Sequence, residues 1–537
     1  MNNKLQIFYP LILVGVLAGG IFLGMSLADN SPANPIIFKG NDRDKFAKVV
    51  RYVEQEYVDS VNTGPLVEEA IQDFLQSLDP HSYYISAEER AAYSEPLEGN
   101  FDGIGVEFRI VKDTVVVVNP ITGGPSEKVG ILAGDRIVTV EDSLIAGVGI
   151  TNRDVMDLLR GKKDTKVKVG ILRGKNEDLQ SVIITRGEIP IVSIPVALKA
   201  DDRTGYIRIT RFARNTFEEF KQALNEIGPG KERLIIDLRG NGGGYLQTAI
   251  ALADEFLKEG ELIVYTEGEN QERRTYEASG RGKLQDIELI ILQNEGSASA
   301  SEILAGAIQD NDRGVIIGRR SFGKGLVQDE IPFRDNSAMR LTIARYYTPA
   351  GRCIQRPYGE DVDYEGDYSD RLQGGELLSA DSISFPDSLR FTTKTGRTVY
   401  GGGGIMPDMF IPVDTTANSE FLSEALYSGA LNRFCFQYAD EHRTSLTDLG
   451  DARGFDSGFQ VNEMIFQEFL AFCAEEDIEP TADELSRSRE ELDRRIAAGV
   501  ARVIHGESGY FQIFLKDDKE YQAALGYGSD ALISQKQ

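Results

Sequence analysis

Cysteine is scarce in this chain, and so are the patterns that cysteine forms at metal sites. The 537 residues include three cysteines, Cys353, Cys435 and Cys473, and no Cys-x-x-Cys pair. Their odd number and wide spacing argue against a zinc knuckle and against a dense disulfide framework. Three buried thiols are the simplest interpretation, because free cysteine is usually buried. A single long-range disulfide between Cys435 and Cys473 is the alternative.

Basic residues are outnumbered by acidic ones. The chain has 58 Lys and Arg against 85 Asp and Glu, which gives a formal net charge of −27. So acidic a chain repels nucleic-acid phosphates, and we therefore expect no nucleic acid among its partners. The negative charge is instead typical of a secreted or membrane-tethered protein that must stay soluble.

Charged side chains are missing altogether from one N-terminal segment. Residues 5–28 are 24 uncharged residues that follow Lys4, and about 20 suffice for a helix to cross a bilayer. We expect an uncleaved membrane anchor within residues 1–29. A cleaved signal is the alternative, because Ser26-Leu27-Ala28 resembles a cleavage site. Positive charge stays in the cytoplasm, so Lys4 predicts that the bulk of the chain is extracytoplasmic, in a bacterial periplasm or at a cell surface.

The rest of the chain divides into four regions. Apolar residues recur at helical spacing in residues 30–90, and residues 91–188 read as short strands with one or two helices. In residues 189–415, unbroken apolar strands alternate with helices, which predicts a buried, largely parallel sheet with crossover helices. Within this region, the polar residues 355–395 are expected to form a loop. Residues 416–537 are acidic and predict a C-terminal helical appendage.

Three serines alternate at the junction between a buried strand and a helix. Ser297, Ser299 and Ser301 lie in the stretch NEGSASASEILAG. Backbone N–H groups at a helix N-terminus are unpaired and favour negative charge, so a serine placed there finds donors for an oxyanion. The simpler alternative is that Ser301 caps the helix and Glu302 complements the helix dipole.

A serine nucleophile also needs a base. No histidine lies between residues 190 and 350. The three histidines of the chain lie beside a turn or in the acidic tail, where a structural role is the simpler interpretation: His81, His442 and His505. Lys324, which stands between two glycines in RRSFGKGLVQDEIPF, is the other available base. Lysine can act as a base when desolvation lowers its pKa from about 10.4 toward 7–8.

A third stretch, DLRGNGGGYLQ, follows another buried strand. It matches neither the GxxxxGK[ST] nor the GxGxxG phosphate-binding pattern. The glycine turn can cradle a phosphate or supply an N–H group to an oxyanion, and by itself it does not distinguish these roles.

Together the three stretches resemble the C-terminal processing peptidases, also called tail-specific proteases. That family carries a Ser-Ala-Ser-Ala-Ser-Glu run, then Gly-Lys-Gly and a glutamine four residues after the lysine. The resemblance implies that Ser299 is the nucleophile, that Lys324 is the general base 25 residues later, and that Gln328 orients the lysine. It covers about residues 44–414 and leaves out the acidic tail.

The same resemblance assigns the oxyanion donors. The N–H group of Ala300 would be one donor, and Gly243 or Gly244 would supply the other. We assign Gly243, although the exact glycine stays open because Gly242 stands where the family usually has proline. The resemblance requires no metal and no cofactor.

Residues 91–188 then resemble a PDZ domain. Gly103, Ile104, Gly105 and Val106 stand where such domains bind a peptide carboxylate through backbone N–H groups. The whole resemblance implies an α/β multidomain fold: a crotonase- or ClpP-like protease core in residues 189–415, a PDZ domain before it, and helical segments at both ends.

The implied function is that of an extracytoplasmic serine endopeptidase that cleaves proteins near their C-termini. Its partners would be proteins with free C-termini and, through the anchor, a membrane, and a homo-oligomer is compatible with this function. Two alternatives belong to other classes. One is an inactive membrane-anchored PDZ adaptor, and the other is a carrier of small lipophiles on the same fold.

Overall fold

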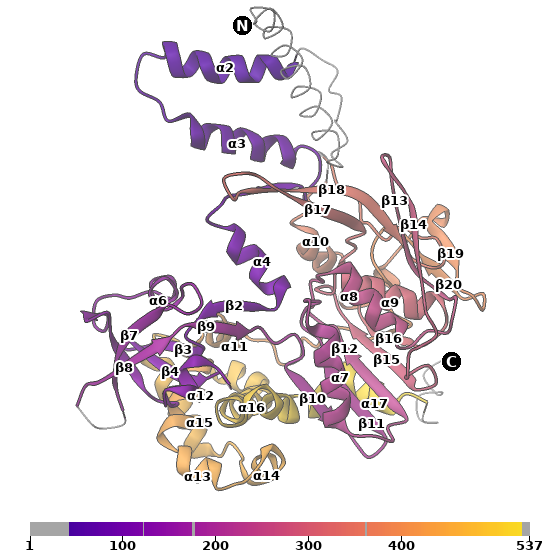
Figure 1. Ribbon diagram of the computed structural model, residues 1–537. Coiled ribbons are helices and arrows are strands. Elements are labelled where there is room, and N and C mark those ends of the chain that lie inside the picture. Colours follow the sequence, from indigo (N-terminus) through magenta and orange to yellow (C-terminus); the bar gives the residue numbers. More distant parts are fainter. Residues whose placement is uncertain (1–41, 122, 174–177, 360–361, 529–537) are drawn as a thin grey trace, which may run out of the picture. The chain divides into compact units, whose positions relative to one another are not determined.

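A computed structural model describes residues 42–121, 123–173, 178–359 and 362–528 (Figure 1). The chain forms two units, residues 1–71 and 72–537. The described part of the first unit holds the two predicted amphipathic helices, α2 (Asp42–Glu56) and most of α3 (Thr63–Gln76). The predicted anchor in residues 1–29 lies outside the described residues, and no helix among those described is both long and apolar enough to cross a bilayer.

The central sheet of the second unit has the predicted alternation of strands and helices. Its spatial order is β10-β11-β12-β15-β16-β21, and every neighbouring pair is parallel except β10 with β11. The strands are β10 (Val196–Lys199), β11 (Thr204–Arg208), β12 (Arg233–Asp237), β15 (Glu288–Gln293), β16 (Val315–Gly318) and β21 (Met409–Phe410). The helices between them are α7 (Thr216–Ile227), α8 (Leu246–Asp254) and α9 (Ala300–Asp310).

Both faces of this sheet are covered, which explains why its strands are apolar without interruption. Successive side chains of a strand point to opposite faces. In β12, Leu234 and Ile236 pack in the core with α7, α8 and α9. Ile235 points the other way and packs with residues of α17 (Lys519–Gly526). The C-terminal region is therefore more than an appendage, because its end completes the core of the sheet.

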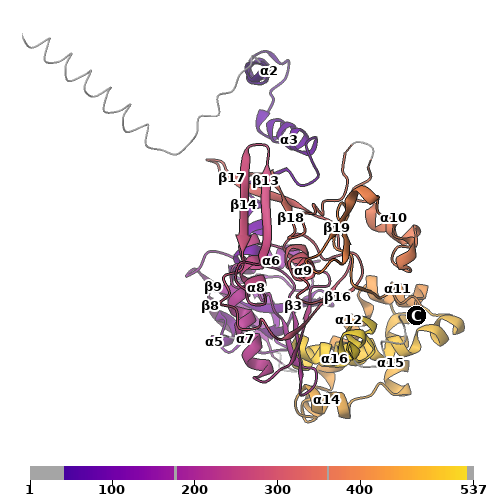
Figure 2. The same ribbon diagram turned by 90° about the vertical axis from the view of Figure 1, so that its right-hand side faces the viewer.

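A second sheet is antiparallel throughout. Its order is β1-β18-β13-β14, with β17 also paired to β18. The strands are β1 (Tyr83–Ile85), β13 (Leu262–Gly268), β14 (Gln271–Glu277), β17 (Leu326–Pro332) and β18 (Ala338–Tyr347). β13 and β14 run side by side as a hairpin (Figure 2). The prediction that residues 30–90 are helical is wrong at its end, because residues 83–85 pair with residues 338–340 as a strand.

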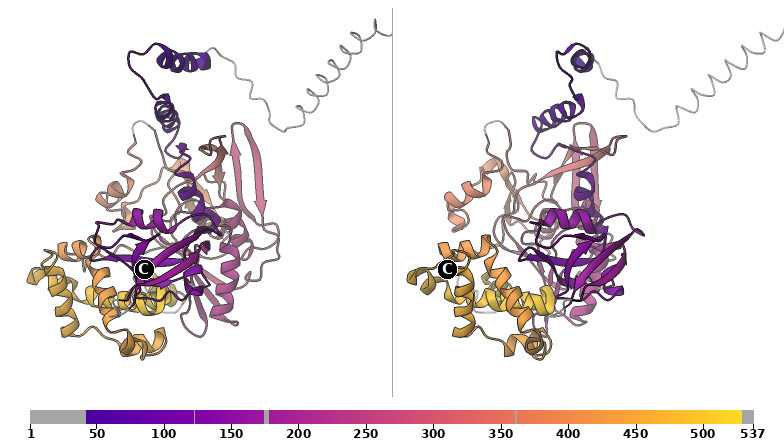
Figure 3. Two further views of the ribbon diagram at one scale, coloured as in Figure 1. Left: turned by 60° about the vertical axis from the view of Figure 1, so that its left-hand side comes forward. Right: turned by 90° about the vertical axis from the view of Figure 1, so that its left-hand side faces the viewer.

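The strand-rich region 91–188 begins with α4 (Arg90–Glu98) and then forms its own domain (Figure 3). Its sheet has the order β3-β4-β5-β7-β8, with β6 beside β5, and a ribbon of β2 with β9 closes its ends. These strands are β2 (Asn100–Gly103), β3 (Val106–Val111), β4 (Thr114–Pro120), β5 (Arg136–Val140), β6 (Ser143–Leu144), β7 (Lys166–Leu172), β8 (Gln180–Thr185) and β9 (Gly187–Pro190). Two helices, α5 (Pro125–Lys128) and α6 (Asn152–Leu159), complete it, and Thr151 caps α6.

The remaining elements lie in the polar stretch 355–395 and in the C-terminal region. The stretch expected to be loop contains α10 (Asp367–Gln373), two 3-10 turns and β19 (Arg390–Thr392), which pairs with β20 (Thr398–Tyr400). The C-terminal helices are α11 (Glu420–Tyr427), α12 (Ala430–Glu441), α13 (Arg443–Thr447), α14 (Ala452–Gly458), α15 (Glu463–Ala474), α16 (Ala482–Phe514) and α17. All three cysteines are free, and Cys435 and Cys473 are buried among these helices, so the disulfide alternative is wrong.

Candidate active site

Three loops meet at the carboxyl end of the central sheet. β12, β15 and β16 are adjacent and parallel, so the loops that leave them start at one edge. The loop after β12 carries the glycine turn 240–244, the loop after β15 carries Ser299, and the loop after β16 carries Lys324. The fold therefore brings together three stretches that are far apart in the sequence.

A cavity of about 1490 Å³ lies at this edge. Ser299, Lys324, Gln328 and Gly243 all line it, and so does Gly244. The predicted nucleophile, base, orienting residue and oxyanion glycines thus share one space. Side chains of α4, α8 and β18 form other parts of its wall.

The three alternating serines differ in what their hydroxyls do. Ser297 Oγ donates to the carbonyl of Leu238 at 2.8 Å, and Ser301 Oγ donates to the carbonyl of Asn241 at 2.8 Å. Both serines are buried, and their hydroxyls bind the loop after β12. Only Ser299 of the three lines the cavity. Helix α9 begins at Ala300, which makes Ser299 the residue before the helix and excludes the alternative in which Ser301 caps it.

Ser299 has a strained backbone. Its φ of 56° and ψ of −113° lie in a region that residues with a side chain rarely adopt. Such strain persists only where surrounding contacts enforce it, and it recurs at functional sites. A sharp strand-to-helix turn of this kind exposes the serine hydroxyl of other hydrolases to substrate. The geometry at Ser299 is therefore that of a presented nucleophile.

Glu302 supplies the contacts that enforce this turn. Its side chain is fully buried and accepts four hydrogen bonds from uncharged donors. One oxygen accepts from the hydroxyl of Ser321 at 2.6 Å and the N–H of Gly323 at 2.7 Å. The other accepts from the N–H groups of Ser299 at 2.8 Å and Lys324 at 2.9 Å. One carboxyl group thus binds the backbones of nucleophile and base together, and its burial raises its pKa to about 7.

The hydroxyl of Tyr346 is a second link between the two backbones. It lies 3.1 Å from the carbonyl oxygen of Ser299 and also within hydrogen-bond distance of the carbonyl oxygen of Lys324. The tyrosine side chain is almost completely buried and belongs to β18. The distance between the two loops is therefore fixed from two sides.

Lys324 has the environment that a neutral lysine needs. Burial lowers the pKa of its amine, and the guanidinium of Arg340 lowers it further. Glu302 and Asp79 oppose this shift without cancelling it. Among the residues that the structure describes, none forms a hydrogen bond or ion pair with the Lys324 amine, although its backbone N–H is held by Glu302.

Gln328 does not contact Lys324 by a hydrogen bond in this structure. Its amide donates instead to Thr342 Oγ1 at 3.5 Å, and that hydroxyl donates to Asp79 at 3.1 Å. Asp79 is buried and also accepts from the hydroxyl of Ser82 at 2.7 Å. The predicted orienting residue therefore belongs to a polar chain that ends on a carboxylate close enough to influence Lys324.

The histidines have the structural surroundings that their positions predict. The Nε2 atom of His81 lies 2.9 Å from the hydroxyl of Tyr364. Burial, together with the charge of Lys324, lowers the pKa of His81 to about 4, so its ring is neutral near pH 7. His442 and His505 pack against aromatic rings of the C-terminal helices.

The glycine turn packs directly against the nucleophile. A side chain on Gly243 would place its Cβ 2.8 Å from Ser299 Cβ and 2.9 Å from the Ala300 nitrogen, so only glycine fits. The N–H group of Gly243 donates to Asn241 Oδ1 at 2.9 Å. Within the described part of the chain, the N–H groups of Ala300 and Gly244 have no hydrogen-bond acceptor. This geometry favours Gly244 over Gly243 as the second oxyanion donor.

The predicted carboxylate loop of the strand-rich domain lies between two strands. Gly103 ends β2 opposite Gly187, and Val106 begins β3. Ile104 and Gly105 form the turn, and their N–H groups donate to no acceptor in the residues described. β3 is the edge strand of its sheet, so its outer side is the side on which an added peptide strand would pair.

Sequence reasoning missed the supporting residues of the site. Glu302 was considered only as a partner of the helix dipole, although an acidic residue three positions after a serine is a recognisable capping pattern. Asp79 and Tyr346 carry no local signal, because they reach the site through strands β1 and β18.

Known protein families match three regions of the chain. The model of peptidase family S41 matches residues 203–365, a PDZ domain matches residues 103–184, and a family of unknown function, DUF8443, matches residues 421–506. The chain is 37% identical over 348 residues to the carboxy-terminal-processing protease of Bartonella bacilliformis, which covers 63% of this chain and 78% of that protein. It is 34% identical over 372 residues to carboxy-terminal processing protease CtpB of Bacillus subtilis, with coverage of 66% and 76%.

The chain belongs to the S41 family of carboxy-terminal-processing proteases. It is thus a serine-type peptidase with a PDZ domain, and its substrates are proteins or peptides. Among solved structures, the photosystem II D1 C-terminal processing protease is 31% identical, with a TM-score of 0.34 and coverage of 61% of this chain and 94% of that one. Membership of this family favours the peptidase over the adaptor and lipophile-carrier alternatives.

Proposed function

We propose that this S41 peptidase is an endopeptidase with a Ser299–Lys324 dyad that cleaves protein substrates near their C-termini, outside the cytoplasm. The observation that carries the proposal is the shared cavity, which a strained serine at a helix N-terminus and a desolvated lysine both line. Peptide hydrolysis by serine needs a base, and desolvation is what makes lysine able to serve.

In the proposed mechanism, the neutral amine of Lys324 takes the proton of Ser299 Oγ while that oxygen attacks the scissile carbonyl carbon. The carbonyl oxygen becomes an oxyanion and accepts hydrogen bonds from the N–H groups of Ala300 and Gly244. The tetrahedral intermediate then collapses, the C–N bond breaks, and the leaving amine receives the proton from Lys324. Water, deprotonated by Lys324, hydrolyses the acyl-enzyme and restores Ser299.

Gln328 has an indirect role in this proposal. Its amide holds Thr342, and Thr342 holds Asp79, so the three form one side of the lysine environment. A substrate that enters the cavity and displaces this amide frees it to contact the amine of Lys324. Gln328 adds no charge to the surroundings of the lysine.

The PDZ domain accounts for the position of cleavage. The turn at Ile104 and Gly105 offers unpartnered N–H groups to a terminal carboxylate, and the free edge of β3 offers main-chain hydrogen bonds to the residues before it. Binding the chain end there brings a nearby peptide bond to the protease core. The uncharged run at residues 5–28 supports tethering to a membrane with the enzyme on its outer side.

The dyad is tested on an unstructured protein with an apolar C-terminus. We expect wild type to cleave it, and Ser299→Ala and Lys324→Ala to lose at least about 10³-fold in kcat, because residues that act as a unit each abolish catalysis. Lys324→Arg should be equally inactive, since a guanidinium keeps its proton. The matched controls are Lys258→Ala and Lys258→Arg, at an exposed lysine outside the cavity.

Two outcomes contradict the proposal. Turnover retained in Lys324→Arg would place the base elsewhere. Equal kcat/KM for the same substrate with a free and with an amidated C-terminus would remove the role of the carboxylate loop, while leaving the dyad intact.

A further inference from the structure

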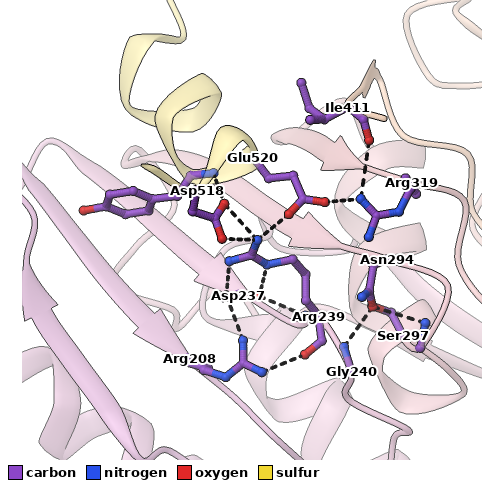
Figure 4. A network of polar contacts seen from close by, with 12 residues as sticks. Arg208, Asp237, Arg239, Gly240, Asn294, Ser297, Arg319, Ile411, Asp518 and Glu520 are labelled. Carbon is purple, nitrogen blue, oxygen red and sulfur yellow. Dashed lines mark hydrogen bonds and ion pairs between the residues drawn. The ribbon is translucent and has the colours of Figure 1, made fainter. Parts of the chain in front are cut away.

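Helix α17, the last described helix, and the residue before it contact two of the three catalytic loops directly, and the third through Arg319, by a network of buried charges (Figure 4). Arg239, in the loop after β12, donates to both carboxylate oxygens of Asp518, at 2.9 Å and 2.7 Å, and also contacts Glu520. Arg319, in the loop after β16, contacts the other oxygen of Glu520. Arg319 also donates to Glu295, in the loop after β15, at 2.8 Å.

These charges are withdrawn from solvent. The side chains of Arg239 and Arg319 are each 10% exposed, and those of Asp518 and Glu520 are 7% and 11% exposed. Asp237 completes the network by accepting from Arg239 and Arg208. A buried charge that loses its partner is costly, so the loops and the helix hold one another in a single arrangement.

Hydrogen bonds connect the charged network to the oxyanion glycines and to the loop of Ser299. Gly240, next to Arg239, donates its N–H to Asn294 Oδ1 at 2.8 Å. Asn241 accepts from the N–H of Ala298 at 3.0 Å, and its side chain accepts from Gly243. The oxyanion glycines and Ser299 are thus only a few covalent and hydrogen bonds away from Arg239.

A second set of hydrogen bonds connects the network to the loop of Lys324. The N–H of Arg319 donates to the carbonyl of Gln293 at 3.1 Å, and two residues later Ser321 donates to Glu302, which holds Lys324. Glu520 bridges Arg239 and Arg319. One carboxylate therefore connects the hydrogen bonds that lead to the oxyanion glycines with those that lead to Lys324. None of the three family matches extends to Asp518 and Glu520, because the last of them ends at residue 506.

We propose that Asp518 and Glu520 are positioning residues of the catalytic centre, and that the C-terminal helix α17 keeps the three loops in register for catalysis. This inference rests on the proposed Ser299–Lys324 function. It assigns α17 a role beyond covering the sheet, because packing by Tyr521 and Ala524 needs no carboxylates.

The test compares kcat per active site in the full-length chain. Asp518→Asn, Glu520→Gln and the double variant preserve shape and, at position 518, a good N-cap for α17. We expect about a tenfold loss of kcat in Glu520→Gln and a larger loss in the double variant, with KM and PDZ binding of a C-terminal peptide unchanged. Active sites are counted by titration with a serine-directed fluorophosphonate, which phosphonylates the serine hydroxyl with loss of fluoride, and the rate of that phosphonylation should fall in parallel with kcat.

Two controls separate positioning from stability. Asp517→Asn changes an exposed carboxylate next to Asp518 and should match wild type. Val503→Ala removes buried apolar atoms from the C-terminal helical core, so it should lower the thermal midpoint while kcat per site, measured well below that midpoint, is retained.

The inference is overturned if the double variant keeps a kcat per titrated site within twofold of wild type. If the double variant does not fold, Glu520→Gln alone decides by the same criterion, since Arg239 and Arg319 then keep their other carboxylate partners. Activity that survives Ser299→Ala would instead refute the proposed function, so the two failures are distinguishable.

Discussion

Two fully buried carboxyl groups flank the catalytic loops, and the protein holds them in opposite ways. Burial favours the neutral form of Asp237, but Arg239 and Arg208 outweigh burial and hold its pKa well below the usual range. Glu302 has no arginine among its hydrogen-bond donors, and burial raises its pKa to about 7. The charged cluster lies where loops must be fixed in place, whereas the group beside the base is surrounded by dipoles.

The difference has a chemical reason. A full negative charge next to Lys324 stabilises the ammonium form, which cannot accept a proton. A carboxyl group that accepts four hydrogen bonds from uncharged donors fixes the loop while its burial disfavours the anion. We infer that rigidity on the α17 side comes from ions, and that rigidity on the lysine side comes from hydrogen bonds with little charge.

The largest expected effect is a loss of stability at the charged cluster around Asp237. Asp237→Ala leaves Arg208, Arg239 and the Tyr206 hydroxyl without a shared acceptor. Breaking a buried pair in this way costs about 3–5 kcal/mol. Chemical denaturation followed by circular dichroism measures the loss in unfolding free energy. The exposed Asp202→Ala is the control. A loss below about 1 kcal/mol would mean that the arginines find equal partners in α17.

The sequence predicts much of the catalytic side of this comparison and little of the ionic side. The chemistry of a serine nucleophile points to the alternating serines and to Lys324 as candidates, and the resemblance to the processing peptidases selects Ser299 and Lys324 among them. Continuous apolar strands that alternate with helices predict a buried, largely parallel sheet, but they do not give the order of its strands. Glu520 and Arg319 are 201 residues apart, and Asp79 and Thr342 are 263 apart, so nothing local marks either pair.

Errors in the predicted fold have the same origin. The strand at residues 83–85 is too short to show a period, and it exists because β18 offers an edge. The region after residue 416 was read correctly as helical, but amphipathic spacing does not say which surface a helix covers. Gly243 illustrates the limit within the site: its need for glycine follows from contact with Ser299, whereas its N–H is engaged by a neighbouring side chain.

A second prediction uses the pH dependence of stability at Glu302. Its native pKa of about 7 lies above the ordinary glutamate value of 4.5, so the native state binds an extra proton between these values. The stabilisation is complete below pH 4.5 and is lost as pH rises to 7, by roughly 3 kcal/mol at 1.36 kcal/mol per pKa unit. The difference in unfolding free energy between wild type and Glu302→Gln should fall across this window. A flat difference would show that Glu302 is ionised throughout.

A third prediction concerns activity. Both Glu302 and Asp79 raise the pKa of Lys324, so removing either anion should lower it. In Glu302→Gln and Asp79→Asn, the rising limb of kcat/KM against pH should move to lower pH than in wild type. The maximal rate should also fall in Glu302→Gln, because an amide nitrogen cannot accept bonds from the loop donors. A shift to higher pH in both variants would exclude Lys324 as the titrating base.

The smallest expected effect tests whether Glu302 alone holds the loops of Ser299 and Lys324 together. Tyr346→Phe removes the hydroxyl that lies beside the carbonyls of Ser299 and Lys324 but keeps the buried ring. One hydrogen bond of this kind contributes about 1 kcal/mol, so the thermal midpoint should fall by only a few degrees. If Glu302 alone sets the distance between the loops, kcat per site stays near wild type. If the hydroxyl shares that task, kcat falls while KM is constant, and the loss should be smaller than the loss in Glu302→Gln, which gives up an acceptor for several donors at once.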